Sequence, residues 1–499
     1  MKIVIVGGGS AGWMSATTFI RSLDCDVTLI ESNNIPVSGV GESTLASIQD
    51  WINFLELGVD ELDFIVETDA TLKQSIKFTD FLTLERRNSF HYPFGDAQIP
   101  PVVWWQNKHK QSKQGHLICG NKYAIGINPL AASAEAGKFD ENSIYSYQFD
   151  AIKFAHFLKK KYCQNVKHIV SDVIGCKQDS GGIKNLKLRN GEKIEADLFV
   201  DCTGFKSLLL GKFLKEPFIS YKDLLPNDTA LATRVPYRDN DKEKQMVSYT
   251  ECTAIGNGWV WQIPLWDKIG TGYVYSSKYI SDEGAKQEFI DHLSIKRLDT
   301  SQCEFKKVPI KAGRYERSFV KNVVAIGLSA GFIEPLEGNG LFSVHHNLLD
   351  LTKTLQRGPV SRMIKDSYNK ITSINMDQWS QFIAIHYAYT QRQDTPYWKD
   401  IFNKEYNFEK GDTYGFVDWG KEIYMFHEYL HLGQGHHYIA SGMDICPYTR
   451  DSSRSYDADI EKAMYKFAKL EEEIEKLPSL YEFLRDRVYN RAITELEHL

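Results

Sequence analysis

Three glycines near the start of the chain have the spacing of a dinucleotide-binding turn. Gly7, Gly9 and Gly12 complete the pattern GxGxxG between the apolar run KIVIV and a helical pattern. The first glycine permits a tight turn, the second lets a pyrophosphate approach the backbone, and the third lets helix and strand pack closely. Glu31 follows 19 residues after Gly12, at the end of a second apolar run, where a carboxylate can bind a ribose hydroxyl. The segment therefore predicts a βαβ unit that binds a nucleotide.

A second motif, from His427 to His437, could hold a metal. HEYLHLGQGHH contains HExxH, which on a helix turns two imidazoles to one face for zinc and supplies Glu428 as a base. His437 stands where some metallopeptidases have a third zinc ligand. The glycine expected at position 434 is Gln434, however, and a peptidase would leave the nucleotide motif unexplained. We expect no metal here, with a zinc protein as a remote alternative.

Two indoles stand two residues apart in GWVWQIP, residues 258–264. Trp259 and Trp261 would share one face of an extended strand that stops at Pro264, because side chains alternate between the two faces of a strand. Taken alone, this pattern is typical of core packing. A functional explanation has to come from the rest of the chain.

The elements around these motifs predict an α/β fold with a β-rich region inside it. Helical patterns lie within 43–66, within 140–165 and over most of the chain after 345, whereas strand patterns dominate 166–200 and 227–280. Two late segments, DCTGF (201–205) and IGLSAGF (326–332), are expected to belong to the same Rossmann core as the first βαβ unit, although long insertions separate them from it in sequence. A cofactor as long as FAD needs contacts at both of its ends, so this arrangement favours FAD over NAD.

The composition is that of a globular protein. Of the 499 residues, 42% are hydrophobic and 25% are charged. A formal charge of −6 gives no electrostatic reason to expect nucleic acid. The eight cysteines form no CxxC pair, no signal peptide precedes the first strand pattern, and no apolar run reaches membrane-spanning length. We therefore expect a soluble, cytoplasmic protein that does not bind membranes.

Together the motifs resemble the flavin-dependent halogenases of the tryptophan-halogenase type. The matching segments occur in family order and cover nearly the whole chain. They are GGGSAGWM (7–14), GVGEST (39–44), LKQSIKF (72–78), DLFVDCTGF (197–205), GWVWQIP (258–264), GTGYVYSS (270–277), FIEPLEGNG (332–340), DTPYW (394–398) and LPSLYEFL (477–484). The resemblance implies an FAD-binding Rossmann-type core like that of flavin monooxygenases of the p-hydroxybenzoate hydroxylase and glutathione reductase type.

The resemblance and the element pattern together predict the domain organisation. Residues 1–345 would form a discontinuous FAD-binding halogenase core, interrupted by β-rich, substrate-contacting segments at 75–140 and 215–310. Residues 346–499 would form a mainly helical C-terminal subdomain that covers the substrate site. The sequence contains no internal repeat and no linker that separates autonomous domains.

Two catalytic residues follow from the resemblance. In the family, reduced FAD, oxygen and halide give hypohalous acid, which travels through a tunnel to an essential lysine. The matching residue is Lys73, whereas Lys77 is expected to be an ordinary charged group on a strand. A hydrogen-bonded hypohalous acid and a haloamine on Lys73 both stay open. Glu337 matches the acid that stabilises the cationic intermediate and removes its proton, although it could instead be a helix N-terminal acid, and Glu334 a buried cap or salt-bridge partner.

The resemblance also assigns residues to the cofactor and the halide. FAD is expected to contact Gly7, Gly9, Ser10, Ala11, Gly12, Glu31, Gly41, Glu42, Ser43, Val173, Gly327, Leu328 and Leu341. Chloride, bromide or iodide would lie at the turn after Glu337, on Asn339 and Gly340. The family often has Ser-Thr-Gly where this chain has Gly-Asn-Gly, so a side-chain hydroxyl is missing and the halide preference can differ. Trp259 and Trp261 would form a wall that keeps organic substrate away from the flavin.

The substrate region matches the family less well. Phe94 in FHYPFG corresponds to the aromatic residue that stacks on the substrate, with Pro93 as its neighbour, although a surface turn is the alternative. The C-terminal region that recognises the amino and carboxyl groups of free tryptophan has no clear counterpart. We therefore expect an electron-rich aromatic small molecule, indole-like or phenolic. The oligomeric state is left open, a homo-oligomer included.

Two other flavin proteins are alternatives to a halogenase. An aromatic flavin monooxygenase shares the fold but needs its substrate beside the flavin, and it commonly takes electrons from NADPH itself. Lys73, Glu337 and the two indoles favour halogenation, and the chain has no obvious nicotinamide site, which implies a separate flavin reductase that supplies FADH2. An FAD-binding redox sensor would have no use for a lysine and a glutamate in these motifs.

Overall fold

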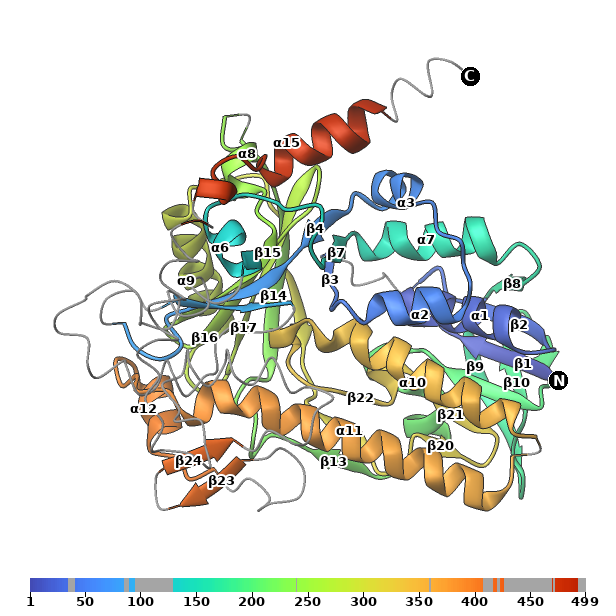
Figure 1. The fold of residues 1–499 in the computed structure, drawn as a ribbon. Coiled ribbons are helices and arrows are strands. Elements are labelled where there is room, and N and C mark those ends of the chain that lie inside the picture. Colours follow the sequence, from blue (N-terminus) through green and yellow to red (C-terminus); the bar gives the residue numbers. More distant parts are fainter. Residues whose placement is uncertain are drawn as a thin grey trace, which may run out of the picture. The chain divides into compact units, whose positions relative to one another are not determined.

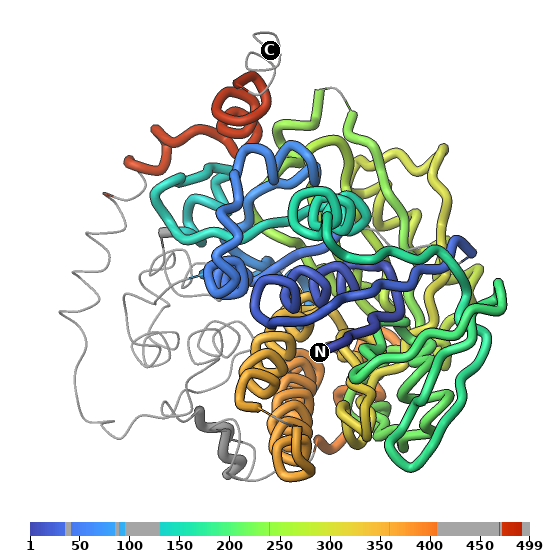
Figure 2. The backbone as a smooth tube through the Cα atoms, turned by 90° about the vertical axis from the view of Figure 1, so that its right-hand side faces the viewer, coloured from blue at the N-terminus to red at the C-terminus, as the bar shows by residue number. Residues whose placement is uncertain are grey.

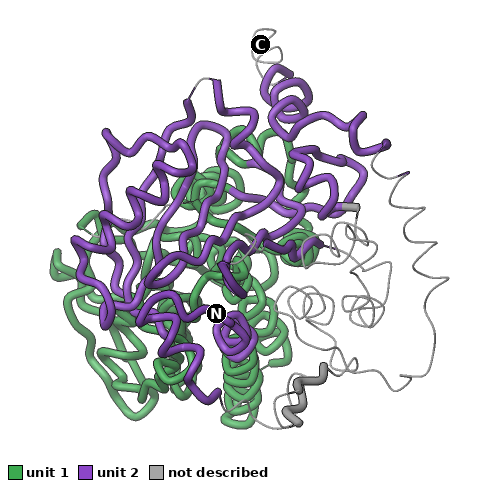
Figure 3. The backbone as a smooth tube through the Cα atoms, turned by 90° about the vertical axis from the view of Figure 1, so that its left-hand side faces the viewer, with its two compact units in different colours: residues 1–70, 149–225, 310–380 green, residues 71–148, 226–309, 381–499 purple. Residues whose placement is uncertain are grey.

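The computed structural model describes residues 1–34, 41–84, 89–94, 129–238, 240–358, 360–406, 416–419, 422–425, 469 and 472–491. The chain forms two compact units, each built from three segments (Figure 3). Unit 1 comprises Met1–Ala70, Phe149–Leu225 and Ile310–Ser380, and unit 2 comprises Thr71–Gln148, Pro226–Pro309 and Gln381–Leu499. This division differs from the predicted one after residue 345, which falls inside helix α10 (Asn339–Gln356) of unit 1.

Unit 1 is built on a six-stranded sheet in the order β20-β21-β12-β1-β2-β8. Five of its strands run parallel, and β20 pairs with β21 in the antiparallel direction. The strands are β1 (Lys2–Val6), β2 (Asp26–Glu31), β8 (Lys167–Val170), β12 (Leu198–Asp201), β20 (Phe319–Val320) and β21 (Val323–Ala325). Central strands of a parallel sheet are buried on both faces, which is why β1 and β12 are continuous apolar runs. The predicted α/β, Rossmann-type core is confirmed.

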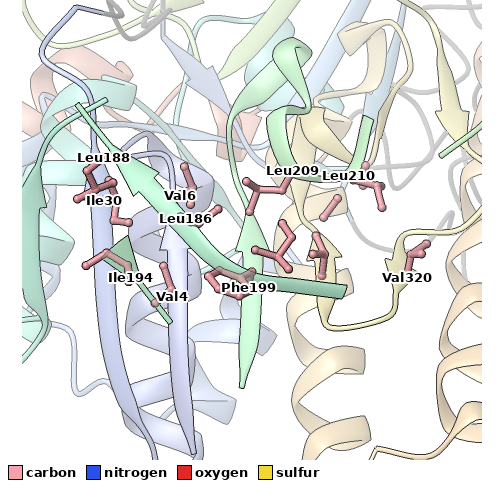
Figure 4. Close-up of a cluster of buried hydrophobic side chains, with 14 residues drawn as sticks. Val4, Val6, Ile30, Leu186, Leu188, Ile194, Phe199, Leu209, Leu210 and Val320 are labelled. Atoms are coloured by element: carbon pink, nitrogen blue, oxygen red, sulfur yellow. The ribbon is translucent and has the colours of Figure 1, made fainter. Parts of the chain in front are cut away.

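A layer of antiparallel strands packs on this sheet. β9 (Val173–Asp179), β10 (Gly182–Leu188) and β11 (Lys193–Ile194) form a β-meander, in agreement with the strand patterns predicted for 166–200. Leu186 and Leu188 of β10 meet Val4, Val6 and Phe199 of the sheet in one buried cluster, which Figure 4 shows. Burial of each such side chain contributes about 1.5–3 kcal/mol, so this layer anchors the strands of the parallel sheet.

Two helices of unit 1 begin directly after an aspartate that caps them. Asp60 accepts hydrogen bonds from the first amides of α3 (Glu61–Thr68), and Asp150 does so for α7 (Ala151–Tyr162). α1 (Ser10–Ser22) joins β1 to β2 and packs against α7 and α10. With α2 (Ile48–Phe54), the helical patterns predicted within 43–66 and 140–165 are confirmed. α10 lies beside α11 (Arg362–Ala388) (Figures 1 and 2). The Tyr368 hydroxyl of α11 donates to the Asn347 carbonyl oxygen of α10.

Short strands and turns complete unit 1. β13 (Phe218–Ser220), β19 (Gly313–Tyr315) and β22 (Gly331–Phe332) form a small antiparallel sheet. The other short elements are β3 (Glu42–Ser43), the 3₁₀ turns at Gly204–Lys206, Gly327–Ser329 and Pro335–Glu337, and a π-helical turn at Leu208–Phe213. Residues 321–346 contain β21, the turn Gly327–Ser329, β22, the turn Pro335–Glu337 and the start of α10.

Unit 2 contains a seven-stranded sheet in the order β18-β14-β17-β16-β15-β5-β6. All neighbours are antiparallel except β15 and β5. The strands are β5 (Ser75–Thr79), β6 (Ser89–Pro93), β14 (Thr229–Pro236), β15 (Tyr249–Ile255), β16 (Gly258–Pro264), β17 (Lys268–Tyr275) and β18 (Lys306–Pro309). Helix α9 (Asp282–Ile295) covers one face, where Phe289 packs with Val260 and Tyr273. The strands predicted for 227–280 are confirmed.

The rest of unit 2 mixes short helices and strands. β4 (Thr71–Lys73) pairs antiparallel with β7 (Ser146–Phe149). The helices are α6 (Pro129–Glu135), α8 (Lys242–Gln245), α12 (Pro396–Phe402), α15 (Leu480–Leu484) and a π-helical turn at Arg485–Tyr489. The prediction of a mainly helical region after 345 missed one strand pair, β23 (Phe416–Trp419) and β24 (Glu422–Met425).

Among the described residues, no helix has the length and apolarity needed to cross a bilayer. In the same part of the chain, no group of three or more His, Cys, Asp or Glu side chains is arranged to hold a metal ion. The HExxH segment at 427–437 lies outside the described residues. Cys25, Cys163, Cys176, Cys202, Cys252 and Cys303 are free thiols.

Candidate active site

The turn between β1 and α1 requires its glycines for the predicted reasons. Gly7 has a φ of +118°, and a Cβ on it would collide with the Cys202 carbonyl oxygen. A Cβ on Gly12 would collide with the Gly7 carbonyl oxygen, because helix and turn touch there. A Cβ on Gly9 would have no heavy atom within 4 Å, so there is open space over the turn. This is the arrangement through which a pyrophosphate can approach the backbone.

The first turn of α1 itself supplies no side chain that would compete with an anion. Its first turn has no acidic residue, and its N-cap, Gly9, makes no side-chain capping bond. Ser10 and Ala11 stand in this first turn, where backbone N–H groups have no acceptor within the helix. The Ser10 hydroxyl donates to the Ala151 carbonyl oxygen at 3.3 Å. The amides of the turn, rather than this hydroxyl, therefore fit a phosphate group.

Glu31 ends β2 close to the glycine turn. Its Oε2 lies 3.1 Å from Nε2 of His168, and a side chain on Gly8 would collide with the same carboxylate. Sequence reasoning missed both contacts. The sequence could have indicated the Gly8 contact, because Gly8 extends the GxGxxG pattern to an uninterrupted GGG. No nearby sequence pattern points to His168, which lies on β8.

Val173 is the first residue of β9 and follows a loop that is tied to Glu31. The Ser171 amide donates to the Glu31 carbonyl oxygen at 2.9 Å. Next to it, Asp172 accepts hydrogen bonds from Ser32 and from Asn34, the latter at 2.9 Å. The Ser32 hydrogen bond, followed by those from Arg189 and Asn34, lowers the pKa of Asp172 to about 2. These bonds fix the loops around the end of β2, where an adenosine would lie.

The second predicted part of the FAD site, around Gly327, lies against the start of α1 in unit 1. Gly327 has a φ of +70°, and a Cβ on it would lie 3.2 Å from both the Ala11 Cβ and the Val344 Cγ2. The turn after β21 thus meets the starts of α1 and α10. Leu341 is buried in the first turn of α10, whereas Leu328 is 38% exposed. Sequence-distant residues of the predicted cofactor set are brought together here.

Glu42 lies beside the start of α10. Its Oε2 is 3.8 Å from the position that a Cβ on Gly340 would occupy. Gly41, with a φ of +97°, precedes it, and Ser43 is buried. Burial raises the pKa of Glu42 to about 7. The side chain can therefore be neutral or charged near neutral pH, next to a predicted halide ligand.

Glu337 and Asn339 flank the N-cap of α10. Glu337 is buried at the end of the turn Pro335–Glu337, and Gly338 follows with a φ of +67°. The Asn339 side chain is also buried, and its Nδ2 donates to the Glu334 carbonyl oxygen at 3.2 Å. Because this bond holds the side-chain amide, the backbone amides of Asn339 and Gly340 are the groups suited to a halide.

In unit 2, Lys73 and Phe94 lie together. Lys73 ends β4 and is 0% exposed, and its Nζ is 5.5 Å from the centroid of the Phe94 ring. The Phe94 amide donates to the Gln74 carbonyl oxygen at 2.9 Å, which fixes the ring next to the lysine, while Pro93 is the register partner of Ser75. A fully buried lysine is rare and requires a specific environment. The predicted catalytic lysine and the predicted stacking ring are thus neighbours.

Lys77 has a different environment. Its Nζ lies 2.8 Å from Oε2 of Glu135, and His91 Nε2 lies 2.8 Å from the same oxygen. Burial raises the pKa of Glu135, but the hydrogen bonds and charges of His91 and Lys77 outweigh it and lower this pKa to about 2. His91 also bonds Ser75 through Nδ1, at 2.8 Å. Lys77 is therefore engaged in an ion pair, as expected for a charged group on a strand.

Val260, between the two indoles on β16, packs against α9. Because side chains alternate along a strand, Trp259 and Trp261 lie on the opposite face of β16. Their ring centroids are 6.1 Å apart, with an interplanar angle of 56°. Trp259 is fully buried and Trp261 is partly buried. Gly272 of β17 is the register partner of Trp261, and a Cβ on it would collide with the indole. The absence of a side chain at Gly272 lets the Trp261 ring lie against the backbone.

We predict that Gly272→Ala destabilises the protein by about 1–3 kcal/mol, because the added methyl group must displace the Trp261 ring. Gly175→Ala is the matched control, since a Cβ on Gly175 of β9 meets no atom within 4 Å. Chemical denaturation followed by tryptophan fluorescence measures both variants. Equal stability of Gly272→Ala and Gly175→Ala would contradict the proposed fit of Trp261 on Gly272.

Comparison with known proteins agrees with these features. The sequence profile of the family described as tryptophan halogenase matches residues 2–454. The chain is 35% identical to tryptophan 6-halogenase SttH of Streptomyces toxytricini over 429 residues, which are 80% of each chain. It is 33% identical to tryptophan 7-halogenase RebH of Lentzea aerocolonigenes over 434 residues, 82% of this chain and 80% of RebH.

Solved structures show the same fold. The crystal structure of SttH superposes with a TM-score of 0.84 at 31% identity, over 97% of this chain and 99% of SttH. The apo structure of VirX1 gives a TM-score of 0.84 at 33% identity, over 98% of this chain and 99% of VirX1. Family profile, curated relatives and solved structures all span most of the sequence. The chain therefore belongs to the tryptophan halogenase family and is a flavin-dependent halogenase.

Proposed function

We propose that the chain is a two-component halogenase that uses FADH2 from a separate flavin reductase to halogenate an electron-rich aromatic small molecule. Lys73 would activate the halogen donor. The observation that carries this proposal is the fully buried Lys73 beside Phe94, in a segment that matches the lysine motif of the family. We further propose that the reaction takes place in the cytoplasm, where reductase and NADH are present and free thiols persist.

The residues of unit 1 fit FAD. The open turn at Gly9, the uncapped start of α1 and Glu31 would hold the pyrophosphate and adenosine. The turn at Gly327, with Ala11 and the first residues of α10, would hold the part nearer the flavin ring. Bound as FADH2, the cofactor would react with oxygen and halide to supply hypohalous acid.

Lys73 would act on the halogen donor. A protonated amine can donate a hydrogen bond to the oxygen of hypohalous acid, which draws electron density from the halogen and makes it a better electrophile. A buried site excludes the water that would otherwise consume the acid. Phe94 would stack on the aromatic substrate, since its ring lies next to the Lys73 ammonium.

Glu337 would act on the substrate. Attack by an aromatic carbon on the halogen would break the halogen–oxygen bond, and the oxygen would leave as water with a proton from the protonated Lys73 amine. The ring cation that results would be stabilised by a buried carboxylate, which then takes the ring proton. Its burial at the fixed turn before α10 supports a defined position for this carboxylate. The ring is thereby restored and the carbon–halogen bond is kept.

The halide would lie at the backbone amides of Asn339 and Gly340, next to Glu42. We predict that bromide binds more weakly as the pH rises through about 7, because burial raises the pKa of Glu42 to about 7 and its ionised form repels an anion. Below this pH the neutral acid is present, and the repulsion is absent.

The KM for bromide, measured from pH 6 to pH 8.5, tests this prediction. In Glu42→Gln the rise of KM with pH should disappear, because the amide stays neutral. Wild-type protein whose bromide KM does not change across this range, or a Glu42→Gln variant that keeps the full rise, would contradict the role of Glu42.

The reaction class is tested with purified protein, FAD, a flavin reductase, NADH and oxygen. Chloride, bromide and iodide are offered separately with a panel of indoles, tryptophan included, and phenols, and products are identified by mass spectrometry. Halogenated product that requires both halide and reductase is expected. Hydroxylated product without halogen would instead identify an aromatic monooxygenase and overturn the proposal.

A further inference from the structure

A chain of three side chains runs from the surface of unit 1 to the carboxylate at the end of β2. Lys159 Nζ lies 3.2 Å from Nδ1 of His168, and His168 Nε2 lies 3.1 Å from Oε2 of Glu31. Lys159 comes from α7, His168 from β8 and Glu31 from β2. Three separate elements therefore converge on one imidazole ring.

The two neighbours of His168 determine its tautomer. An ammonium only donates hydrogen bonds, so Nδ1 must accept from Lys159 and carries no proton. A carboxylate only accepts, so Nε2 must carry the proton and donate it to Glu31. The neutral tautomer with the proton on Nε2 satisfies both contacts. The tautomer with the proton on Nδ1 would point an N–H at the Lys159 ammonium and a lone pair at the Glu31 carboxylate.

The ring and the carboxylate are also held by packing. The Trp13 indole meets His168 edge-on, with centroids 5.4 Å apart, and Lys159 lies 5.4 Å from the Trp13 ring centroid. Trp13, Lys159 and His168 line a pocket of about 310 Å³, which His156 also lines. The Glu31 carboxylate also lies close to Gly8, where an added Cβ would collide with the same Oε2. Neither ring nor carboxylate can turn without losing these contacts.

We propose that His168 is a positioning residue for the cofactor: its Nε2–H holds Glu31 in the orientation that binds the adenosine ribose of FAD. The inference rests on the proposed FAD site. Glu31 uses Oε2 for His168, and its second oxygen, Oε1, accepts the ribose hydroxyl. Lys159 acts one step further out, since it selects the tautomer of His168 that can donate.

The affinity for FAD tests the role of His168. In His168→Leu the donor is lost while an apolar side chain still packs on Trp13, and we expect the Kd for FAD to rise about tenfold, as for a lost hydrogen bond to a charged group. In His168→Gln, an amide donor should restore most of the affinity. The KM for FADH2 should rise in His168→Leu, while kcat at saturating FADH2 stays at the wild-type value.

A double-mutant cycle with Glu31→Gln separates positioning from a general loss of structure. If His168 acts through Glu31, His168→Leu has little further effect in the Glu31→Gln background. His156→Leu, the same substitution in the same pocket, is the matched control and should bind FAD like the wild type. Wild-type affinity in His168→Leu, or fully additive effects in the cycle, would overturn the inference. Failure of the wild-type protein to bind FAD would overturn the proposed function itself.

Discussion

Lys73→Ala is expected to lower the rate of product halogenation by at least about 10³-fold, because the donor that activates the hypohalous acid is removed from a water-excluding site. Lys73 is fully buried at the end of β4, and its Nζ lies 5.5 Å from the centroid of the Phe94 ring. Solvent at this position cannot replace it with the same geometry. FAD binding should be unchanged, since the residues assigned to the cofactor belong to unit 1 and Lys73 belongs to unit 2.

Two further variants make the Lys73 result specific. Lys73→Met fills the volume of the side chain without its charge, and it should be as inactive as Lys73→Ala while unfolding near the wild-type temperature. Lys77→Ala removes a lysine four positions away that is paired with Glu135; this costs about 1.5–3 kcal/mol of stability and should leave most activity. Substantial halogenation by Lys73→Met, or equal losses in the Lys73 and Lys77 variants, would contradict the assignment.

Glu337→Gln is expected to lower the rate of product formation by about 10²–10⁴-fold, because the amide cannot take the proton that the halogenated ring must lose. Halide oxidation should continue in this variant, since the proposed role of Glu337 lies after the halogen donor has formed. Hypohalous acid escaping into solution can be trapped by a halogen-accepting dye. The variant should therefore halogenate the dye while it fails to halogenate its substrate.

This pattern of product and dye distinguishes the role of Glu337 from a role in halide binding. If Glu337→Gln stopped dye halogenation as well, the carboxylate would be needed at an earlier step. Glu316→Gln provides a control on the same unit, because Glu316 is exposed and takes no part in the proposed site. Wild-type product formation by Glu337→Gln would contradict its catalytic role.

Local sequence patterns predicted the nucleotide-binding part of the fold well. The GxGxxG turn, β1, α1 and β2 depend on contacts between residues close in sequence, and Gly7 and Gly12 show the expected collisions for a side chain. The strands of 227–280 were recognisable from alternation alone. Lys73 and Phe94 came from resemblance to a family, and the structure then brought them within 5.5 Å of each other.

Contacts between distant segments could not be predicted from the sequence. His168 lies 137 positions after Glu31, and Glu135 lies 58 positions after Lys77, so no spacing rule connects these pairs. The division into two units also depends on contacts between distant segments. A helical pattern identifies α10 as a helix but does not say in which unit the helix packs. Each unit is built from three segments that alternate along the chain.

The HExxH motif illustrates how context decides the meaning of a short pattern. His427 to His437 lie outside the described residues, but the family profile runs through them, from residue 2 to residue 454. The motif therefore falls within a sequence region shared with tryptophan halogenases, and the zinc alternative is not favoured.

A single-turnover reaction tests the central claim most directly. FAD is reduced chemically, without any reductase, and mixed with the protein, bromide, an indole substrate and oxygen, and the product is analysed by mass spectrometry. The proposed function predicts a product with the isotope doublet of bromine, formed by the wild type and not by Lys73→Met. A product that is one oxygen heavier and contains no bromine, formed equally by both proteins, would contradict it.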